Sequence, residues 1–356
     1  MTVTHIWLRA ETKAQEQRTA LPPSNAKKLI DAGYKVTVEK STQSIFNDDD
    51  YFLVGCEIAE PGSWVEAPEH AIILGLKELP EASFPLTHRH IYFAHAYKEQ
   101  SGWEHILGRF KEGKGKLFDL EFLLDGNNRR IAAFGYWAGF AGAALAVKSW
   151  IEQQSNEVPA LTSVNSYNNK EELLQELKTD LSKFKQLPNL MVIGAKGRSG
   201  SGAIDLAKAL DIETIGWDIE ETQKGGPFKE INDANIFVNC VLINQDLPPF
   251  VTQEMLSDEN RNLSVIADVS CDPYGSYNPL PIYNQCTTFK FPSIAIKAGE
   301  KPLELIAIDH LPSLLPKESS EDYSNQLLPY LVALNDENNP VWNKALEIFD
   351  HHCGKI

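Results

Sequence analysis

A short apolar strand that runs into a glycine-rich turn and a helix is the feature that most restricts the fold of this chain. Residues 190–194 (LMVIG) have a strand pattern, and residues 203–210 (AIDLAKAL) have a helical one. Between them Gly194, Gly197 and Gly200 follow one another at three-residue spacing. Glycines here permit a tight turn and bring the N–H groups of a helix N-terminus against a pyrophosphate, so the segment predicts a dinucleotide site.

The residue that follows the next predicted strand supports this interpretation and selects the dinucleotide. Residues 213–217 have a strand pattern, and Asp218 comes directly after them, 24 residues beyond Gly194. A carboxylate at this point accepts a hydrogen bond from the ribose of NAD and repels the 2′-phosphate of NADP, so NAD is the expected cofactor. Because the glycine spacing differs by one residue from G-x-G-x-x-G, a glycine-rich turn without a ligand is the alternative.

Strand and helix patterns alternate along the rest of the chain, which is typical of a parallel α/β protein. A chain of 356 residues exceeds what one hydrophobic core usually organises, so two such units are expected. We predict strands at 3–8, 35–39, 71–76, 90–94, 190–194, 213–217, 236–241, 263–268 and 304–308, and helices at 25–32, 103–111 and 170–185. The helical residues from Ser319 onward are expected to pack back on the first unit.

The stretch Ile131–Val147 carries no charged residue and contains the spacing Gly135-x-x-x-Gly139. We predict a buried strand that passes into a closely packed core helix. A transmembrane span is the alternative, but the stretch is at the short limit and is rich in Gly and Ala rather than in Leu and Ile. No membrane partner is therefore expected.

The composition excludes other classes of partner. The formal net charge of −16 would repel nucleic-acid phosphates, and no basic patch is segregated in the sequence, so no nucleic-acid partner is expected. The five cysteines include no C-x-x-C pair, which argues against a zinc ribbon and a disulfide scaffold. We expect no metal, and a reducing compartment.

Two charged side chains follow predicted strands of the first unit and are candidates for acid–base chemistry. Lys77 follows 71–76 and precedes Glu78, and His95 follows 90–94. Ligands of open α/β sheets bind at the carboxyl ends of the strands, where a desolvated lysine has a lowered pKa and histidine titrates near neutral pH. A solvated lysine and a structural histidine are the alternatives.

Arg18, Arg129 and Arg130 are candidates for holding a carboxylate through two parallel hydrogen bonds. Ordinary surface or interdomain ion pairs are the alternative for these arginines. Glu121, in the segment FDLEFL, is either a carboxylate at the end of a strand or a surface charge.

Longer motifs identify a family. Residues 8–39 (LRAETKAQEQRTALPPSNAKKLIDAGYKVTVE) resemble the N-terminal segment shared by alanine dehydrogenases, transhydrogenase nucleotide-binding subunits and lysine-forming saccharopine dehydrogenases. Seven further segments resemble the NAD-dependent, lysine-forming saccharopine dehydrogenases: GLKELPE (75–81), FAHAYKEQSGW (93–103), LFDLEFL (117–123), RRIAAFGYWAGFAGAALAV (129–147), GAKGRSGSGAIDL (194–206), WDIEETQKGGPF (217–228) and IDHLPSLLP (308–316). The resemblance spans essentially the whole chain.

The resemblance implies an α/β fold of two Rossmann-like, parallel-sheet domains like that of alanine dehydrogenase, with the active site in a cleft between them. Residues 1–130 and 318–356 are expected to form the substrate domain, and residues 131–317 the NAD-binding domain. The implied reaction is the oxidative deamination of saccharopine. NAD takes a hydride from the glutamyl α-carbon, and the resulting imine is hydrolysed to lysine and 2-oxoglutarate.

The resemblance also implies roles for individual residues. Lys77 matches the base for the secondary amine of the substrate, and His95 matches a second acid–base group that serves water addition. Glu78 and Glu121 match carboxylates that tune this pair. The implied substrate ligands are Arg18, Lys77, Gln100, Arg130, Phe134 and Val269. The implied NAD contacts are Arg129, Gly194, Gly197, Arg198, Gly200, Asp218, Thr222, Leu242, Ile308, Asp309, His310 and Leu311.

The chain departs from the fungal members of the family at two cysteine positions. Ser199 stands where they carry a cysteine that can pair with the one matching Cys240, so that disulfide cannot form here. Ala96 stands at the second position. The tail also lacks their peroxisomal ending, which favours the cytoplasm.

An alanine dehydrogenase-like enzyme and a non-catalytic NAD-binding partner protein are the alternative functions. The expected partners are saccharopine, lysine and 2-oxoglutarate, and the sequence is compatible with a monomer. Residues 1–130 carry a net charge of −3 and the remainder −13, so most of the acid excess lies outside the unit that carries Lys77 and His95. Because the substrates are anionic, this distribution predicts a cationic site in the first unit.

Overall fold

The computed structural model describes residues 3–154, 161–243 and 245–356. The chain forms two compact units. The N-terminal unit runs to Ala133 and resumes at Pro316, and the central unit comprises Phe134–Leu315. The resemblance implies crossings after residues 130 and 317, and this division of the chain has them after Ala133 and Leu315.

The N-terminal unit contains a sheet of six parallel strands in the order β3-β2-β1-β4-β5-β6. The strands are β1 (His5–Leu8), β2 (Lys35–Glu39), β3 (Glu57–Ala59), β4 (Ile72–Leu74), β5 (Arg89–Tyr92) and β6 (Lys116–Asp119). The strands β2 and β3 lie on one side of β1, and the strands β4, β5 and β6 lie on the other side. The loops after β1 and β4 therefore leave the sheet in opposite directions, which opens a crevice at their carboxyl ends.

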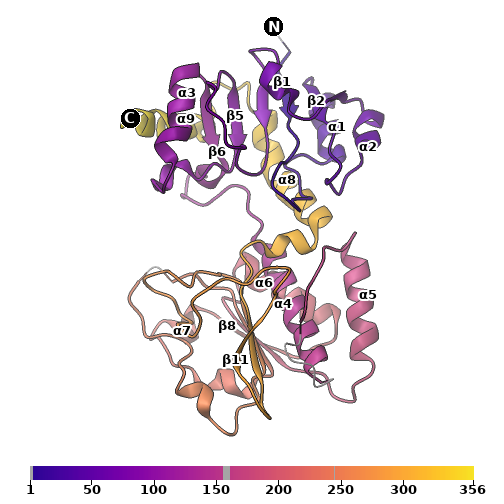
Figure 1. Cartoon of the computed structure of the whole chain (residues 1–356), viewed down its shortest axis with the longest axis vertical. Helices are drawn as coiled ribbons and strands as arrows, with labels where there is room; N and C mark the ends of the chain where they lie inside the picture. Colours follow the sequence, from indigo (N-terminus) through magenta and orange to yellow (C-terminus); the bar gives the residue numbers. More distant parts are fainter. Residues whose placement is uncertain (1–2, 155–160, 244) are drawn as a thin grey trace. The chain divides into compact units, whose positions relative to one another are not determined.

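Helices from both ends of the chain cover this sheet. They are α1 (Pro23–Asp31), α2 (Asp48–Leu53), α3 (Trp103–Gly113), α8 (Pro316–Val332) and α9 (Pro340–Cys353), with the short 3₁₀ turns η1 (Ser63–Glu66), η2 (Ala96–Lys98) and η3 (Leu120–Phe122). Figure 1 shows α1 and α2 beside β1 and β2, and α3 and α9 beside β5 and β6. The C-terminal α9 packs through Phe349 against Phe110 of α3, edge to face at 6.0 Å between ring centroids.

Alternation along the strands assigns side chains to the two faces of this sheet. Ile73 and Leu117 are buried in the same cluster as Phe110 and Phe349, on the face covered by α3 and α9. The neighbours in sequence, Ile72 and Leu74, are also fully buried, and they point to the opposite face. A sheet buried on both faces explains why these strands read as continuous apolar runs in the sequence.

The central unit contains a second six-stranded sheet, in the order β11-β12-β10-β9-β7-β8. The strands are β7 (Leu190–Ile193), β8 (Thr214–Trp217), β9 (Ile236–Asn239), β10 (Val265–Asp268), β11 (Ile294–Lys297) and β12 (Leu303–Ile306). Five strands are parallel, and β11 pairs antiparallel with β12 at the edge. The strand β11 is absent from the sequence prediction, because four residues of mixed burial give too weak a pattern.

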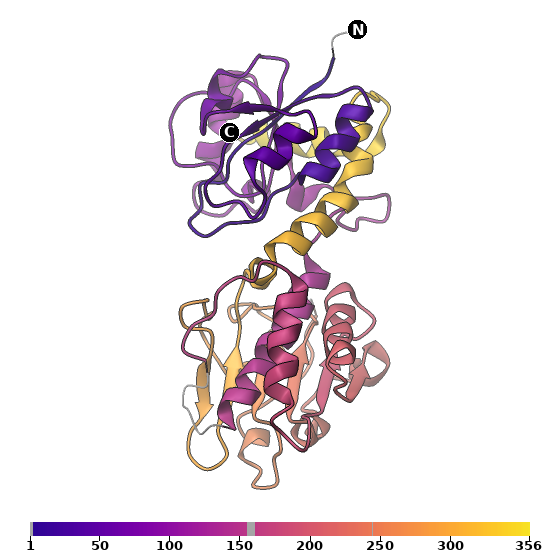
Figure 2. The same ribbon diagram turned by 90° about the vertical axis from the view of Figure 1, so that its right-hand side faces the viewer.

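The helical elements of the central unit are α4 (Gly135–Gln153), α5 (Lys170–Leu181), α6 (Arg198–Ala209), α7 (Ile219–Thr222), η4 (Lys229–Asp233), η5 (Met255–Ser257) and η6 (Leu311–Leu314). One face of the sheet, with Val192 and Val238, shares a core with α4, α5 and α6. Figure 2 shows these helices against the sheet. The other face, with Ile193 and Phe237, packs against η4, η5 and the loops around them.

The apolar stretch 131–147 differs from its prediction in one respect. No strand precedes the helix: α4 begins at Gly135, and the Ile131 N–H instead donates to the Leu123 carbonyl within the N-terminal unit. The glycines bring α4 and α6 into close contact, since a Cβ at Gly139 would lie 1.7 Å from the Ser199 carbonyl oxygen. A Cβ at Gly202 would lie 1.9 Å from the Tyr136 carbonyl oxygen. Among the described residues, no helix is long and apolar enough to cross a bilayer.

Candidate active site

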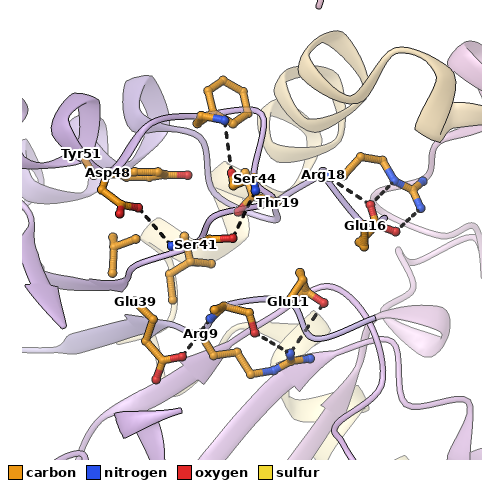
Figure 3. Close-up of a pocket in the computed structure, with 14 residues that line it drawn as sticks. Arg9, Glu11, Glu16, Arg18, Thr19, Glu39, Ser41, Ser44, Asp48 and Tyr51 are labelled. Atoms are coloured by element: carbon orange, nitrogen blue, oxygen red, sulfur yellow. Dashed lines mark hydrogen bonds and ion pairs between the residues drawn. The ribbon is translucent and has the colours of Figure 1, made fainter. Parts of the chain in front are cut away.

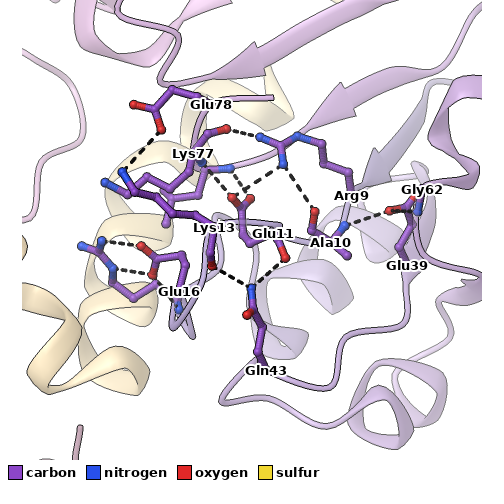
Figure 4. A network of polar contacts seen from close by, with 12 residues as sticks. Arg9, Ala10, Glu11, Lys13, Glu16, Glu39, Gln43, Gly62, Lys77 and Glu78 are labelled. Atoms are coloured by element: carbon purple, nitrogen blue, oxygen red, sulfur yellow. Dashed lines mark hydrogen bonds and ion pairs between the residues drawn. The ribbon is translucent and has the colours of Figure 1, made fainter. Parts of the chain in front are cut away.

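The crevice of the N-terminal unit is built on a buried ion pair that holds the backbone of Lys77. The Glu11 carboxylate accepts the N–H groups of Leu76 and Lys77 at 2.6 and 2.9 Å. The Arg9 guanidinium donates to the Lys77 carbonyl and lies 3.6 Å from Glu11. These residues follow β1 and β4, the two strands at which the order of the sheet reverses, and Figure 4 shows their network. The backbone N–H and the backbone carbonyl of Lys77 are therefore both held in place.

Gly75 allows this arrangement because it has no side chain. A Cβ at Gly75 would lie 2.4 Å from Nε of Arg9, far inside van der Waals contact. The Arg9 side chain lies against the backbone of Gly75, and its guanidinium also faces the Tyr92 ring at 5.6 Å. Burial raises the pKa of Glu11, while the charge of Arg9 and the N–H groups of Leu76 and Lys77 oppose that change.

Burial, more than the mixed charges around it, favours the neutral form of the Lys77 side chain. Burial lowers the pKa of Lys77, and the nearby Arg18 charge lowers it further. The carboxylates of Glu16 and Glu78 act in the opposite direction without reversing the change. An amine with a lowered pKa is available as a proton acceptor closer to neutral pH than an exposed lysine is.

Arg18 is paired within the protein and does not stand open toward a ligand. Its Nε and Nη2 donate to the two oxygens of Glu16 at 2.8 and 2.7 Å, and the side chains are 3% and 4% exposed. Burial of Glu16 alone would raise its pKa, but the hydrogen bonds and charge of Arg18 outweigh burial, and the pKa of Glu16 is lowered. In this structure the expected carboxylate clamp is therefore occupied by a carboxylate of the same loop.

His95 stands at the end of β5 in the left-handed conformation, with φ 53°. Its Nε2 lies 3.6 Å from Oε1 of Glu78, and its ring stacks on Phe93 at 6.1 Å between centroids. Burial lowers the pKa of His95, and the carboxylates of Glu78 and Glu121 oppose this effect. The imidazole is consequently neutral, and able to accept a proton, over more of the pH range around neutrality.

Glu121 joins the residues that follow β5 to those that follow β6. Its carboxylate binds Lys98 at 3.0 Å and Arg130 at 2.9 Å. Just before it, Asp119 accepts the N–H groups of Ala94, Ala96 and Glu121, which fixes the backbone on both sides of His95. The residues at the carboxyl ends of β5 and β6 therefore carry both positive and negative charges. The charge distribution of the sequence had predicted a cationic site here.

A small cavity lies beside this network. It has a volume of about 20 Å³ and is lined by Arg9, Glu16, Arg18, Tyr51 and neighbouring residues. Figure 3 shows the Arg18–Glu16 pair at one side of it and the serines 41 and 44 at the other. This volume holds one water molecule and no organic substrate.

The glycine loop of the central unit has the geometry of a phosphate cradle. Gly194 has φ +88°, and a Cβ at Gly200 would lie 2.1 Å from the Gly194 carbonyl oxygen. Gly197 is the N-cap residue of α6 and is exposed, and no side-chain hydrogen bond caps this helix. A diphosphate can thus approach the first turn of α6, where the N–H groups and the helix dipole attract anions. The residues fit a dinucleotide, and Gly200 accounts for the close contact of the turn with the helix.

Asp218 follows β8 and faces the same loop. One oxygen accepts the Lys196 N–H at 2.8 Å, and the other caps α7 by accepting the Ile219 N–H at 2.9 Å. The carboxylate retains lone pairs for a ribose hydroxyl. Thr222 is buried, and its hydroxyl donates to the Asp218 carbonyl, so its side chain supports α7.

The remaining predicted cofactor residues differ in exposure. Leu242 follows β9 and is 66% exposed, and Asp309 is also exposed. Ile308 and Leu311 are buried in the core, where only their backbone can reach a ligand. The His310 ring lies 4.8 Å from that of Phe289. Arg198 is exposed at the start of α6, whereas Arg129 belongs to the N-terminal unit.

The predicted substrate ligands are divided between the units. Arg18, Lys77, Gln100 and Arg130 belong to the N-terminal unit, and Phe134 and Val269 belong to the central one. Gln100 is exposed after η2. Phe134 is the N-cap residue of α4. The Val269 side chain lies against α4 at Gly142.

Comparison with known proteins identifies the family of the chain. Residues 7–141 match the family model of the alanine dehydrogenase/PNT N-terminal domain, and residues 227–353 match that of the alanine dehydrogenase/PNT C-terminal domain. Proteins named saccharopine dehydrogenase [NAD(+), L-lysine-forming] are more similar. That of Yarrowia lipolytica is 51% identical, covering 99% of this chain and 98% of its own. That of Emericella nidulans is 53% identical over the same shares, and that of Schizosaccharomyces pombe is 47% identical with 100% of each chain covered. The chain belongs to the NAD-dependent, L-lysine-forming saccharopine dehydrogenases.

Solved structures of more distant proteins share the fold. An L-alanine dehydrogenase superposes with a TM-score of 0.66 at 18% identity, covering 98% of this chain and 93% of its own. A transhydrogenase from Sinorhizobium meliloti superposes with a TM-score of 0.64 at 16% identity, covering 96% and 97%. The predicted α/β fold with two Rossmann-like units is confirmed. Membership of the saccharopine dehydrogenase family decides against the two alternative functions drawn from those groups.

Sequence reasoning did not select Arg9, Glu11, Glu16 or Asp119. Arg9 follows the predicted strand 3–8 as directly as Lys77 follows its own, and Glu11 comes two residues later, so the strand-end rule could have found them. Asp119 ends β6, a strand absent from the prediction. Glu16 lies in an irregular loop, where no periodicity indicates which side chain meets Arg18.

Proposed function

We propose that this protein catalyses the reversible, NAD-dependent oxidative deamination of L-saccharopine to L-lysine and 2-oxoglutarate. The observation that carries the proposal is the near-complete match, at about half of all positions, to proteins that bear this activity in their names. The site supports it, because Lys77 and His95 lie at neighbouring strand ends with lowered pKa values.

The glycine loop, α6 and Asp218 are the residues that we assign to NAD. The diphosphate would meet the first turn of α6, and the Asp218 carboxylate would accept a hydrogen bond from a ribose hydroxyl. When bound, NAD supplies a hydride acceptor. The carboxylate of Asp218 would also repel a 2′-phosphate, which favours NAD over NADP.

Lys77 and His95 divide the proton transfers. Lys77, whose pKa is lowered by burial and by Arg18, takes the proton of the secondary amine as the carbon–nitrogen bond is oxidised. His95 accepts a proton from the water that adds to the imine carbon, and Glu78 at 3.6 Å stabilises the imidazolium that forms. Arg130 and Lys98 hold Glu121 beside this pair and offer cations to the substrate carboxylates.

Arg18 can serve a substrate carboxylate only by exchanging partners. In this structure Glu16 occupies Nε and Nη2 of Arg18. A substrate carboxylate would therefore compete with Glu16 for the guanidinium of Arg18. We also propose a cytoplasmic location, supported by five cysteines that are free thiols.

The test is NADH formation, followed by absorbance, with saccharopine, L-alanine and L-glutamate offered separately. We expect turnover with saccharopine alone. Lys77→Met should slow turnover strongly and leave NADH binding nearly unchanged, whereas Lys27→Met, on the exposed face of α1, should behave like the wild type. Equal activity with alanine would overturn the substrate assignment, and unaltered turnover of Lys77→Met would overturn the role of Lys77.

A further inference from the structure

Two cysteines to which the proposed reaction gives no role lie in contact at the carboxyl end of the central sheet. Sγ of Cys271 is 3.3 Å from Sγ of Cys286, and Cys271 also donates to the Ala307 carbonyl at 3.1 Å. Cys271 follows β10, and Cys286 belongs to the segment that returns to the end of β12. The two thiols are 15 positions apart in sequence, so their meeting is a product of the fold.

The backbone around both cysteines is held in place. Thr287 donates its N–H to the Ala307 carbonyl at 2.7 Å, and its hydroxyl accepts the Ala307 N–H at 2.9 Å. On the other side, Asp268 accepts the hydroxyl groups of Ser270 at 2.6 Å and Tyr283 at 2.7 Å. Both sulfur atoms are therefore presented to each other by ordered segments.

We propose that Cys271 and Cys286 are a reversible disulfide pair that is oxidised by small-molecule disulfides. A disulfide bond is about 2.05 Å long, so the sulfurs must approach by roughly 1.3 Å, which rotation of the two side chains about χ1 can supply. Cys286 is exposed and open to a reagent, whereas Cys271 is half-buried behind it. The other cysteines, Cys56, Cys240 and Cys353, make no contact with each other among the described residues.

The chemistry is two successive exchange steps. The Cys286 thiolate attacks one sulfur of the reagent disulfide, which forms a mixed disulfide and releases one reagent thiol. The Cys271 thiolate then attacks Sγ of Cys286 and releases the second thiol. Two protein S–H bonds are lost and one S–S bond is formed. The two protons and two electrons leave in the two reagent thiols.

The surrounding charges order these steps and select the reagent. Burial raises the pKa of Cys271, and Cys286, Asp268 and Asp309 raise it further. Cys286 is therefore the attacking thiol, and Cys271 becomes the resolving thiol once Cys286 is capped. The carboxylates also repel an anionic reagent, so a dicationic disulfide such as cystamine should react faster than oxidised glutathione.

The link would join the two ends of the 272–285 loop at the carboxyl end of the sheet. A bond between these positions closes a short loop of the unfolded chain and so stabilises the folded state. Oxidation should accordingly raise the melting temperature of the full-length protein, on the order of 5 °C. Neither the disulfide exchange nor the melting-temperature measurement requires NAD. Failure of this proposal would therefore leave the proposed enzymatic function unchanged.

The test treats the full-length protein with cystamine and analyses its unreduced peptides by mass spectrometry. We expect a peptide that joins Cys271 to Cys286, two hydrogens lighter than the reduced pair, together with a higher melting temperature that dithiothreitol reverses. In Cys286→Ser, the link and the thermal shift should be lost. Cys353→Ser is the matched control and should retain them. A persistent cystamine adduct on Cys286 without the link, or an unchanged melting temperature in the linked protein, would overturn the proposal.

Discussion

A hydrogen bond of 2.9 Å joins the backbone N–H of Lys77 to the carboxylate of Glu11. Since Arg9 donates to the carbonyl of the same residue, the peptide groups of Lys77 are bound by both members of one buried ion pair. The position of the lysine thus depends on a loop that begins more than 60 residues earlier, at the end of β1. The neighbouring strands β1 and β4 bring the two loops together.

Glu11→Ala should therefore reduce both stability and turnover. It leaves Arg9 buried without its partner and two N–H groups without an acceptor, and removing one member of a buried pair costs about 3–5 kcal/mol of unfolding free energy. Glu11→Gln keeps one acceptor oxygen and should lose less. Urea unfolding and saccharopine-dependent NADH formation measure the two effects. Wild-type stability of Glu11→Ala would contradict the structural role of the pair.

The sequence predicts which strand ends carry the residues of this site better than it predicts which side chains contact one another there. Lys77 and His95 could be selected because each directly follows an apolar strand, and strand ends of parallel sheets are where ligands bind. The partner of Arg18 could not be predicted, because Glu16 reaches it through an irregular loop without periodicity. Nor could the antiparallel β11, since three of its four residues are partly buried and one is exposed, a pattern that resembles a loop.

Glu78→Gln should move the acid limb of the pH profile of kcat/KM to lower pH. The Glu78 carboxylate raises the pKa values of both Lys77 and His95 against the dominant effect of burial. Without its charge both groups lose their protons at lower pH, and a base is active in its unprotonated form. The profile for saccharopine oxidation measures the shift. Glu81→Gln, an exposed carboxylate of the same segment, should leave the profile in place, and a shift to higher pH in Glu78→Gln would contradict the assignment.

Asp119 should make the protein less stable as the pH rises from about 4 to about 6. Burial raises its pKa from 3.8 to about 6, although N–H groups of Glu121, Ala94 and Ala96 oppose the change. The folded state therefore holds this proton more tightly than the unfolded state does. Stability is fully present below the unfolded pKa and is lost as the pH rises through the folded one, by up to about 3 kcal/mol.

Asp119→Asn isolates this contribution. The difference in unfolding free energy between wild type and Asp119→Asn should shift in favour of the variant across the same pH window, as measured by urea unfolding at several pH values. The exposed Asp246→Asn should show no such trend. A difference that is independent of pH would exclude Asp119 as the group responsible.

Asp218→Asn should weaken the preference for NAD over NADP while keeping the cap of α7, although its amide nitrogen cannot accept the Lys196 N–H as the second carboxylate oxygen does. The asparagine oxygen can still cap α7, as Asp218 does at Ile219, but the charge that repels a 2′-phosphate is gone. Asp218→Ala removes the cap as well, which costs about 1 kcal/mol. The ratio of kcat/KM for the two cofactors gives the result. A wild-type ratio in both variants would remove Asp218 from the ribose contact.

Gly139→Ala and Gly108→Ala should have opposite effects on stability, although each places a methyl group in a helix. At Gly139 the new Cβ would lie 1.7 Å from the Ser199 carbonyl oxygen, so α4 and α6 must separate. Overpacking of this kind costs about 1–3 kcal/mol or more, and the displaced partner is the helix that carries the glycine loop. At Gly108, in α3, nothing lies within 4 Å of the new Cβ, and alanine should stabilise the helix by about 0.4–1 kcal/mol. Thermal unfolding of the two variants compares them directly, with NADH affinity as a second measurement that only Gly139→Ala should weaken. Equal stability of the two variants would contradict the close contact between α4 and α6.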